Sequence, residues 1–207
     1  MQQQELLPPT TEELEQYHSW WAGLPPTWKK AFNEVTLRRS STEQLPDDAL
    51  HHIWHSPAIR FAGPTAPYPN MTFELENLDG VLALPRMEIF VFTFQKIRSI
   101  EPVAQLPQLK SLFVFNNQIE TLAGVEALRD LQELYFNVNA VRSLQPLEHL
   151  TNLHTIYCNH NRLESLEGIG PQHAGVLQKF FCLPNDNLPN AEVIRVERDF
   201  GIRCMEG

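Results

Sequence analysis

Three histidines are grouped in the segment His51-His52-Ile53-Trp54-His55, and histidine is a side chain that ligates metals and transfers protons near neutral pH. His51 and His55 are four residues apart, so on a helix they share one face, with a spacing that can hold a metal ion. The sequence identifies no cysteine or carboxylate as a further ligand. We therefore expect a solvated or helix-capping histidine pair and no metal site. A metal-binding or enzymatic role of this His- and Trp-rich N-terminal region is the alternative.

Nucleophilic catalysis is a second chemical possibility, but its motifs are missing. The nine Gly residues form no phosphate-binding loop, and the sequence contains neither G-x-S-x-G nor H-E-x-x-H. Cys158 and Cys182 recur at one position of the repeat described below, where the side chain points inward, so we expect both to be buried and unreactive. A disulfide between them would require oxidation, and the role of Cys204 is left open. The sequence predicts no catalytic residue, no cofactor and no enzymatic activity.

Aromatic residues at a regular spacing form the most informative group. Phe113, Tyr135 and Tyr157 follow one another every 22 residues, with Val91 one period earlier and Phe181 24 residues later. Tyrosine and phenylalanine are frequent anchors of protein interfaces. If the elements that carry these residues lie side by side, the side chains form one apolar stripe.

An internal repeat supplies those elements, because a fixed period of 20 to 50 residues defines a whole architecture. Leu84, Leu106, Leu128 and Leu150 recur every 22 residues without an insertion. Each repeat follows the pattern L-x-x-L-x-L-x-x-N-x-L, as in residues 109–119. The L-x-L core is a short strand with two inward apolar residues, and neighbouring strands pair about 4.8 Å apart.

This pattern resembles leucine-rich repeats. Its length is similar to that of the 22-residue class found in bacterial internalins and in a regulatory subunit of a eukaryotic protein phosphatase. The resemblance implies an α/β fold, a solenoid with short parallel strands on its concave face. Internalins imply adhesion and the phosphatase subunit implies regulation of an enzyme, and neither specific role is carried over to this chain.

The asparagine of each repeat is expected to turn the chain and to bond neighbouring backbone groups through its amide. Successive residues at this position would stack into a buried ladder that satisfies the backbone polar groups of each turn. The expected ladder comprises Gln95, Asn117, Asn139, Asn161 and Asn185.

The residues that flank the inward pair point onto the concave face, where partners of repeat proteins bind. An exposed apolar patch of this kind commonly marks an interaction site. The alternatives are cross-strand stacking that only stabilises the sheet, an N-terminal segment folded over it, burial in a homodimer, and glycan binding. The expected partner-binding residues are Val91, Phe113, Phe115, Glu133, Tyr135, Asn137, Tyr157, Asn159, His160 and Phe181.

A solenoid exposes its core at both ends, so both ends need caps. Three helical patterns lie between residues 10 and 62, with start signals at Thr10–Glu13, Pro25-Pro26 and Asp47-Asp48. We expect the tryptophans here to be core residues of the cap, with Trp20 turned toward solvent. The predicted division is a helical capping region at 1–58, repeats at 59–169 with an irregular first repeat at 59–83 and regular repeats from 84, and a last degenerate repeat with a C-terminal cap at 170–207. The C-terminal cap contains an expected helix at 190–200 and a strand at 202–205.

The composition and net charge of the chain limit the classes of partner that we expect. The chain has 207 residues, of which 43% are hydrophobic, enough for a globular core. Its net charge of -9 repels nucleic acid and anionic lipid, and no apolar run approaches the roughly 20 residues of a membrane helix. Three cysteines and the absence of a secretory leader at the N-terminus favour a cytoplasmic location. We expect a protein partner, no nucleic acid, no membrane, and a monomer rather than a homodimer.

Overall fold

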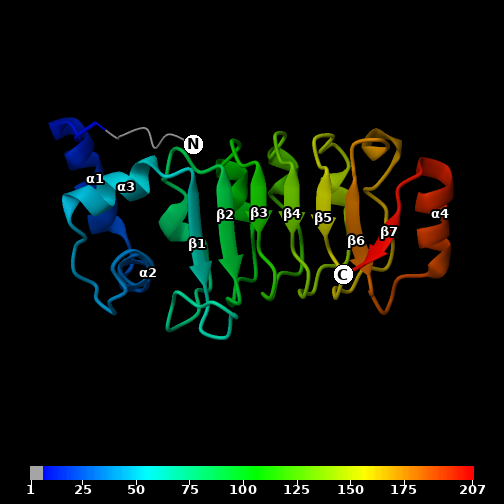
Figure 1. The fold of residues 1–207 in the computed structure, drawn as a ribbon, viewed down its shortest axis with the longest axis horizontal. Coiled ribbons are helices and arrows are strands. Elements are labelled where there is room, and N and C mark those ends of the chain that lie inside the picture. Colours follow the sequence, from blue (N-terminus) through cyan, green and yellow to red (C-terminus); the bar gives the residue numbers. More distant parts are fainter. Residues whose placement is uncertain (1–6) are drawn as a thin grey trace.

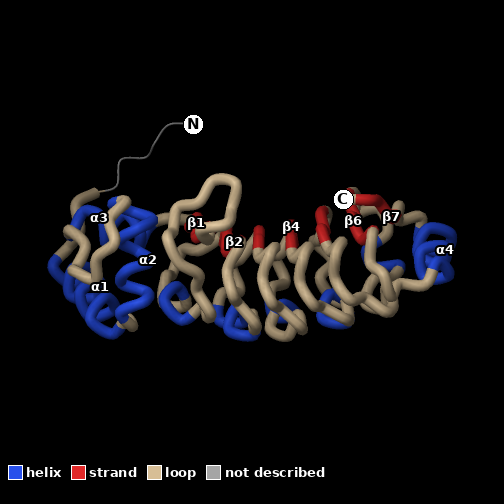
Figure 2. Tube along the Cα trace, turned by 90° about the horizontal axis from the view of Figure 1, so that it is seen from below, coloured by secondary structure: helices blue, strands red, loops and turns tan. Residues whose placement is uncertain are grey.

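The computed structural model describes residues 7–207 and shows a solenoid in which seven parallel strands lie side by side in chain order (Figure 1). The strands are β1 Ala58–Ala62, β2 Ile89–Thr93, β3 Ser111–Phe113, β4 Glu133–Tyr135, β5 Thr155–Tyr157, β6 Lys179–Leu183 and β7 Cys204–Glu206. Short 3-10 turns lie on the opposite side of the array from the strands (Figure 2). The predicted α/β solenoid is confirmed. Residues 1–6, at the start of the expected capping region, lie outside the described residues.

The strands are in register, so equivalent residues of each repeat form rows across the sheet. Phe90 pairs with Leu112, Leu112 with Leu134, and Leu134 with Ile156. Each of these side chains is fully buried, as the inward position of the repeat requires. The core is therefore one continuous stack of apolar rows, and no single repeat could bury its own face alone.

Three helices cover the N-terminal end of this stack, as the sequence predicts. They are α1 Thr11–Gly23, α2 Pro26–Leu37 and α3 Asp47–His55. The Thr10 hydroxyl accepts a hydrogen bond from the Glu13 N–H at 3.2 Å, and the Glu13 carboxylate accepts one from the Thr10 N–H at 2.8 Å, which completes the predicted capping box. Pro26 occupies the first turn of α2, where a missing N–H costs nothing.

Aromatic packing joins the helical cap to the repeats. The Trp28 ring lies 5.4 Å from the Phe61 ring and 6.0 Å from the Phe92 ring, measured between ring centroids. Trp20 is half-buried, whereas Trp21 is buried, and the Trp20 ring packs edge-on against Phe32 at 5.0 Å and against Trp54 at 5.7 Å. The cap and the first repeats therefore share one core.

The amide ladder connects the turns on one edge of the array. The Asn139 Oδ1 atom accepts a hydrogen bond from the Ile119 N–H at 2.9 Å, and its Nδ2 group donates to the Val114 carbonyl at 2.9 Å. Each ladder residue repeats this bridge to the preceding turn, with small variations at the ends. The bonds to preceding backbone N–H groups are made by Gln95, Asn117, Asn139, Asn161 and Asn185. Asn117 and Asn139 are only half-buried, whereas we expected a fully buried row.

The C-terminal cap consists of α4 Asn190–Phe200 and strand β7. Gly201 ends α4 in the left-handed conformation with φ 66°, as a glycine after a helix commonly does. The expected helix is confirmed, and the final strand begins at Cys204 instead of Ile202. Within residues 7–207, the helices are all too short or too polar to cross a bilayer.

Candidate binding surface on the strand face

The outer surface of the sheet, called the strand face from here on, carries four aromatic rings in one stack. The ring of Tyr135 lies 4.5 Å from that of Phe113 and 4.4 Å from that of Tyr157, and the Tyr157 and Phe181 rings are 4.1 Å apart. Neighbouring planes deviate from parallel by 26°, 11° and 18° in the same order. All four side chains are half-buried. The structure therefore brings the predicted aromatic residues together as one surface.

This row extends further at both ends than the sequence indicates. Arg60 of β1 pairs with Val91, and Met205 of β7 pairs with Phe181, so both side chains continue the same row. Arg60 is exposed and Met205 is half-buried. The row therefore begins with a positive charge and ends with a flexible apolar side chain. Sequence analysis missed both residues because neither of the terminal strands follows the 22-residue period.

Polar residues line the stack on both sides. The Ser111 hydroxyl donates a hydrogen bond to the Glu133 carboxylate at 2.8 Å, which fixes that carboxylate beside Tyr135. Partial burial, Glu133 and Tyr157 together raise the pKa of the Tyr135 hydroxyl, so this group stays protonated at neutral pH. His160 is exposed at one edge, and Asn137 is half-buried.

Asn159 does not lie on an open surface, contrary to our expectation. Only 4% of this residue is exposed. Gly207 packs on its side chain, and the Gly207 N–H donates to the Leu183 carbonyl at 3.0 Å. The last strand therefore adds to the sheet, and Gly207, directly after it, covers Asn159. Phe115 remains half-buried, with its ring edge-on to Phe94 at 6.0 Å.

One row at the edge of the strand face has an unusual backbone conformation. Phe94, Asn116, Val138 and His160 all have positive φ, between 53° and 56°. The left-handed region is uncommon for residues other than glycine and disfavours β-branched side chains most. Val138 is nevertheless 40% exposed, so this conformation presents an apolar side chain to solvent.

His51 of α3 is buried and His55 is half-buried, so the expectation of a solvated pair is wrong. The Tyr17 hydroxyl lies 2.9 Å from His51 Nδ1 and 3.2 Å from His55 Nε2. The Glu13 carboxylate lies 3.2 Å from His55 Nε2, so a carboxylate partner does exist. Glu13 belongs to α1, so no local sequence spacing relates it to the histidines of α3. His52 is exposed on another side of the helix.

The environment of His55 favours its neutral form. Burial of the imidazole, the nearby Arg86 guanidinium and His51 lower the pKa of His55, against the opposing effect of Glu13. Among residues 7–207, no group of three or more His, Cys, Asp and Glu side chains is arranged to hold a metal ion. We interpret the cluster as a polar connection between α1 and α3.

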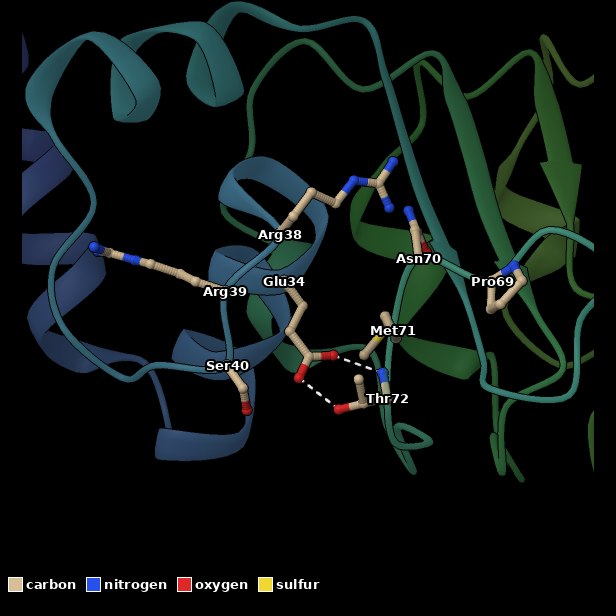
Figure 3. Close-up of a pocket in the computed structure, with 8 residues that line it drawn as sticks. All are labelled: Glu34, Arg38, Arg39, Ser40, Pro69, Asn70, Met71 and Thr72. Carbon is tan, nitrogen blue, oxygen red and sulfur yellow. Dashed lines mark hydrogen bonds between the residues drawn. The ribbon is translucent and has the colours of Figure 1, made fainter.

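A pocket of about 390 Å³ lies where α2 meets the segment that follows the proline-rich loop 63–70 (Figure 3). The buried Glu34 carboxylate accepts hydrogen bonds from both the backbone N–H and the hydroxyl of Thr72, each at 2.6 Å. Figure 3 shows Arg38 extending toward Asn70, while Arg39 points away. Because Thr72 already occupies both carboxylate oxygens, Glu34 serves to attach the helical cap to the first repeat.

Comparison with known proteins agrees with this architecture. The family model described as Leucine Rich repeats (2 copies) matches residues 129–171. The crystal structure of an internalin, inlF, from Listeria monocytogenes superposes with a TM-score of 0.54 at 17% sequence identity, covering 74% of this chain. The chain therefore contains leucine-rich repeats, and its fold is similar to that of the internalin inlF.

The chain spans about half of the solved internalin structure, covering 47% of it. An internalin C2 structure from the same organism is 15% identical over 79% of this chain and 90% of that one, with a TM-score of 0.37. No curated protein matches the sequence. The similarity to inlF therefore concerns the fold and does not identify a partner.

Proposed function

We propose that the chain is a non-catalytic protein-interaction module that binds a partner protein or peptide on the strand face. The observation that carries this proposal is the continuous stack of Phe113, Tyr135, Tyr157 and Phe181, which remains half-exposed over four neighbouring strands. Rigid aromatic rings lose little conformational entropy on binding and supply large contact areas. Glu133, Asn137 and His160 border the stack and would select the partner through polar contacts.

The orientation of the rings distinguishes between classes of partner. In a face-to-face stack, both faces of the Tyr135 and Tyr157 rings are covered by their neighbours. A sugar or a nucleobase stacks on an open ring face. A ligand arriving at the strand face meets ring edges and two tyrosine hydroxyls instead, which suits the mixed apolar and polar surface of a protein. We therefore favour a protein partner over a glycan.

The proposal is tested with a Tyr135→Ala variant. A partner is first isolated from the source cells by chemical cross-linking, identified, and purified, and its Kd for the wild-type chain is measured by calorimetry. We expect Tyr135→Ala to weaken binding at least about 30-fold, as the loss of a central aromatic anchor does. The melting temperature should change little, because Tyr135 lies half-buried on the outer side of the sheet, away from the buried rows of the core, and Tyr157 and Phe181 remain stacked.

The matched control is Glu148→Ala, which alters an exposed residue on the turn side of the array. This variant should bind like the wild type. A Tyr135→Ala protein with a much lower melting temperature and unchanged affinity would mean that the rings only stabilise the sheet. Loss of binding in Glu148→Ala with unchanged binding in Tyr135→Ala would place the contact away from the strand face.

We also propose a reducing, cytoplasmic location, which the three free cysteines support. Fractionation of the source cells with an antibody against the chain checks this proposal. Recovery of the chain in the soluble interior is expected, and recovery in the medium or at the cell surface would contradict it.

A further inference from the structure

The three cysteines of the chain all lie in its last three strands or directly beside them. Cys182 belongs to β6 and Cys204 to β7, and Cys158 follows β5. Phe180 pairs with Cys204, and Phe181 pairs with Met205. Cys204 therefore shares the inner side of the sheet with Phe180 and with Cys182, which lies two residues after Phe180.

The register is irregular at this point. The pairs Phe181–Met205 and Leu183–Glu206 leave Cys182 as the extra residue of β6, so the strand bulges there. A bulge bends the strand and re-aims the side chain at its centre. The bulged residue is Cys182, and the neighbouring strand β7 contains one cysteine, Cys204.

The two thiols differ in exposure and in acidity. Cys182 is fully buried, whereas Cys204 is half-buried. Contact with the Cys182 thiol lowers the pKa of the Cys204 thiol, against the opposing effects of its partial burial and of Glu197. The same contact and burial raise the pKa of Cys182. Cys204 is thus the thiol that reaches both solvent and the thiolate form more readily.

We propose that Cys204 and Cys182 form a redox-modifiable pair that a peroxide converts into an intramolecular disulfide. The Cys204 thiolate attacks one oxygen of hydrogen peroxide, the O–O bond breaks, and the released hydroxide takes up a proton to leave as water. Cys204 is then a sulfenic acid. The Cys182 sulfur attacks the Cys204 sulfur, the S–O bond breaks, and the Cys182 proton leaves with the hydroxide as a second water. The two thiols are oxidised and the peroxide is reduced.

The disulfide would close the segment 183–203, which contains α4, and would attach β7 covalently to β6. Strand β7 carries Met205, the last side chain of the aromatic row, and is followed directly by Gly207, which covers Asn159. Oxidation would therefore hold the C-terminal end of the strand face in place. This modification does not depend on the proposed partner binding.

The test uses the full chain treated with a small excess of hydrogen peroxide, followed by alkylation in denaturant and peptide mass spectrometry. We expect the number of free thiols to fall from three to one, with Cys182 and Cys204 in one linked peptide. The melting temperature should rise by about 5 °C on oxidation, because a closed loop restricts the unfolded chain, and should return on reduction.

Two variants serve as a matched pair. Cys158→Ala should still lose two thiols, and Cys204→Ser should keep both remaining thiols under the same treatment. The circular dichroism spectra of both variants must equal that of the wild type for the comparison to hold, and peptide mapping of the wild type decides the case by itself if they do not. A Cys158–Cys182 linkage, a Cys204 sulfenic or sulfonic acid without a linked partner, or three unchanged thiols would each overturn the proposal.

Discussion

Val138 holds a left-handed backbone conformation that a β-branched residue rarely adopts, with φ 56°. Asn116 occupies the same place one repeat earlier with φ 54°, and asparagine tolerates this region far better. We predict that Val138→Asn raises the free energy of unfolding by about 1 kcal/mol, since strain of this kind costs of order 1 to 3 kcal/mol. The exposed valine side chain contributes little burial to lose. Thermal unfolding measures the effect.

The reverse substitution is the control for this prediction. Asn116→Val should lower the melting temperature by a similar amount, because it introduces the strain that Val138→Asn removes. Equal melting temperatures for Val138→Asn and the wild type would show that the left-handed conformation of this row carries no strain.

The contribution of Asn139 to the free energy of unfolding comes from its hydrogen bonds. Its amide accepts from the Ile119 N–H and donates to the carbonyls of Val114 and Phe136, each at 2.9 Å. We predict that Asn139→Leu lowers the free energy of unfolding by about 1 to 3 kcal/mol, because these backbone groups lose their partners. Urea titration gives the value.

Asn137 provides the comparison, because it lies two residues earlier on the outer side of the sheet and is half-buried. Asn137→Leu should change stability by less than about 0.5 kcal/mol, as for a surface substitution. If the two variants were equally stable, the ladder would be dispensable for folding.

At the level of single residues, the periodic positions were predictable and the exceptions were not. The 22-residue spacing places Phe113, Tyr135 and Tyr157 in one row because each is the last residue of its strand and the strands pair in register. The burial of Asn159 depends on Gly207, which is distant in sequence and belongs to no repeat. A contact with a residue outside the repeats produces no periodic pattern in the sequence.

Among the elements, the contact between α1 and α3 should have a stability that depends on pH. His55 faces Glu13, Tyr17 and His51, with Arg86 nearby, and its pKa lies below the ordinary value of 6.5. A lowered pKa means that the unfolded chain binds a proton more readily than the folded chain. The stabilising contribution is therefore complete above about pH 6.5 and is lost as the pH falls through the lower, folded pKa.

His173 adds to the same dependence from the other side of the molecule. Burial lowers its pKa, while hydrogen bonds with the Leu147 carbonyl and the Gly170 N–H hold the ring. We predict that the free energy of unfolding decreases between pH 7.5 and pH 5.5, and that His55→Gln reduces this decrease. Urea titrations of both proteins at the two pH values measure it. An equal decrease in both would mean that His55 is not involved and that other groups carry the pH dependence.

The elements themselves could be predicted wherever local chemistry marks their ends. The capping box at Thr10 and the proline at position 26 locate α1 and α2, and Gly201 marks the end of α4. The register of β1 and β7 could not be derived, since the loop 63–70 and the helix α4 interrupt the period. For that reason the positions of Arg60 and Met205 in the aromatic row could not be predicted from the sequence.

For the whole molecule, the repeat decides the architecture because each turn buries its apolar residues only against its neighbours. The architecture of the regular repeats therefore follows from the 22-residue spacing of their apolar residues. The partner does not follow from it, because the outward positions of the strands are free of the repeat's own packing requirements. The packing of the helical cap onto the repeats, through Trp28 and Phe61 and through Glu34 and Thr72, also depends on contacts that no period encodes.

The oligomeric state is a property of the whole molecule, and we predict a monomer. The rings of the strand face are already half-buried in their own stack. Pairing two such faces would therefore bury less apolar area than pairing faces with unstacked, fully exposed rings. The net charge of -9 adds a repulsion between copies that grows at low ionic strength. Light scattering coupled to size exclusion should give a mass near 23.8 kDa over a wide range of concentrations. A stable mass of twice that value, returning to the single mass in Tyr135→Ala, would instead make the strand face a self-association surface, because only the loss of its central ring would then separate the copies.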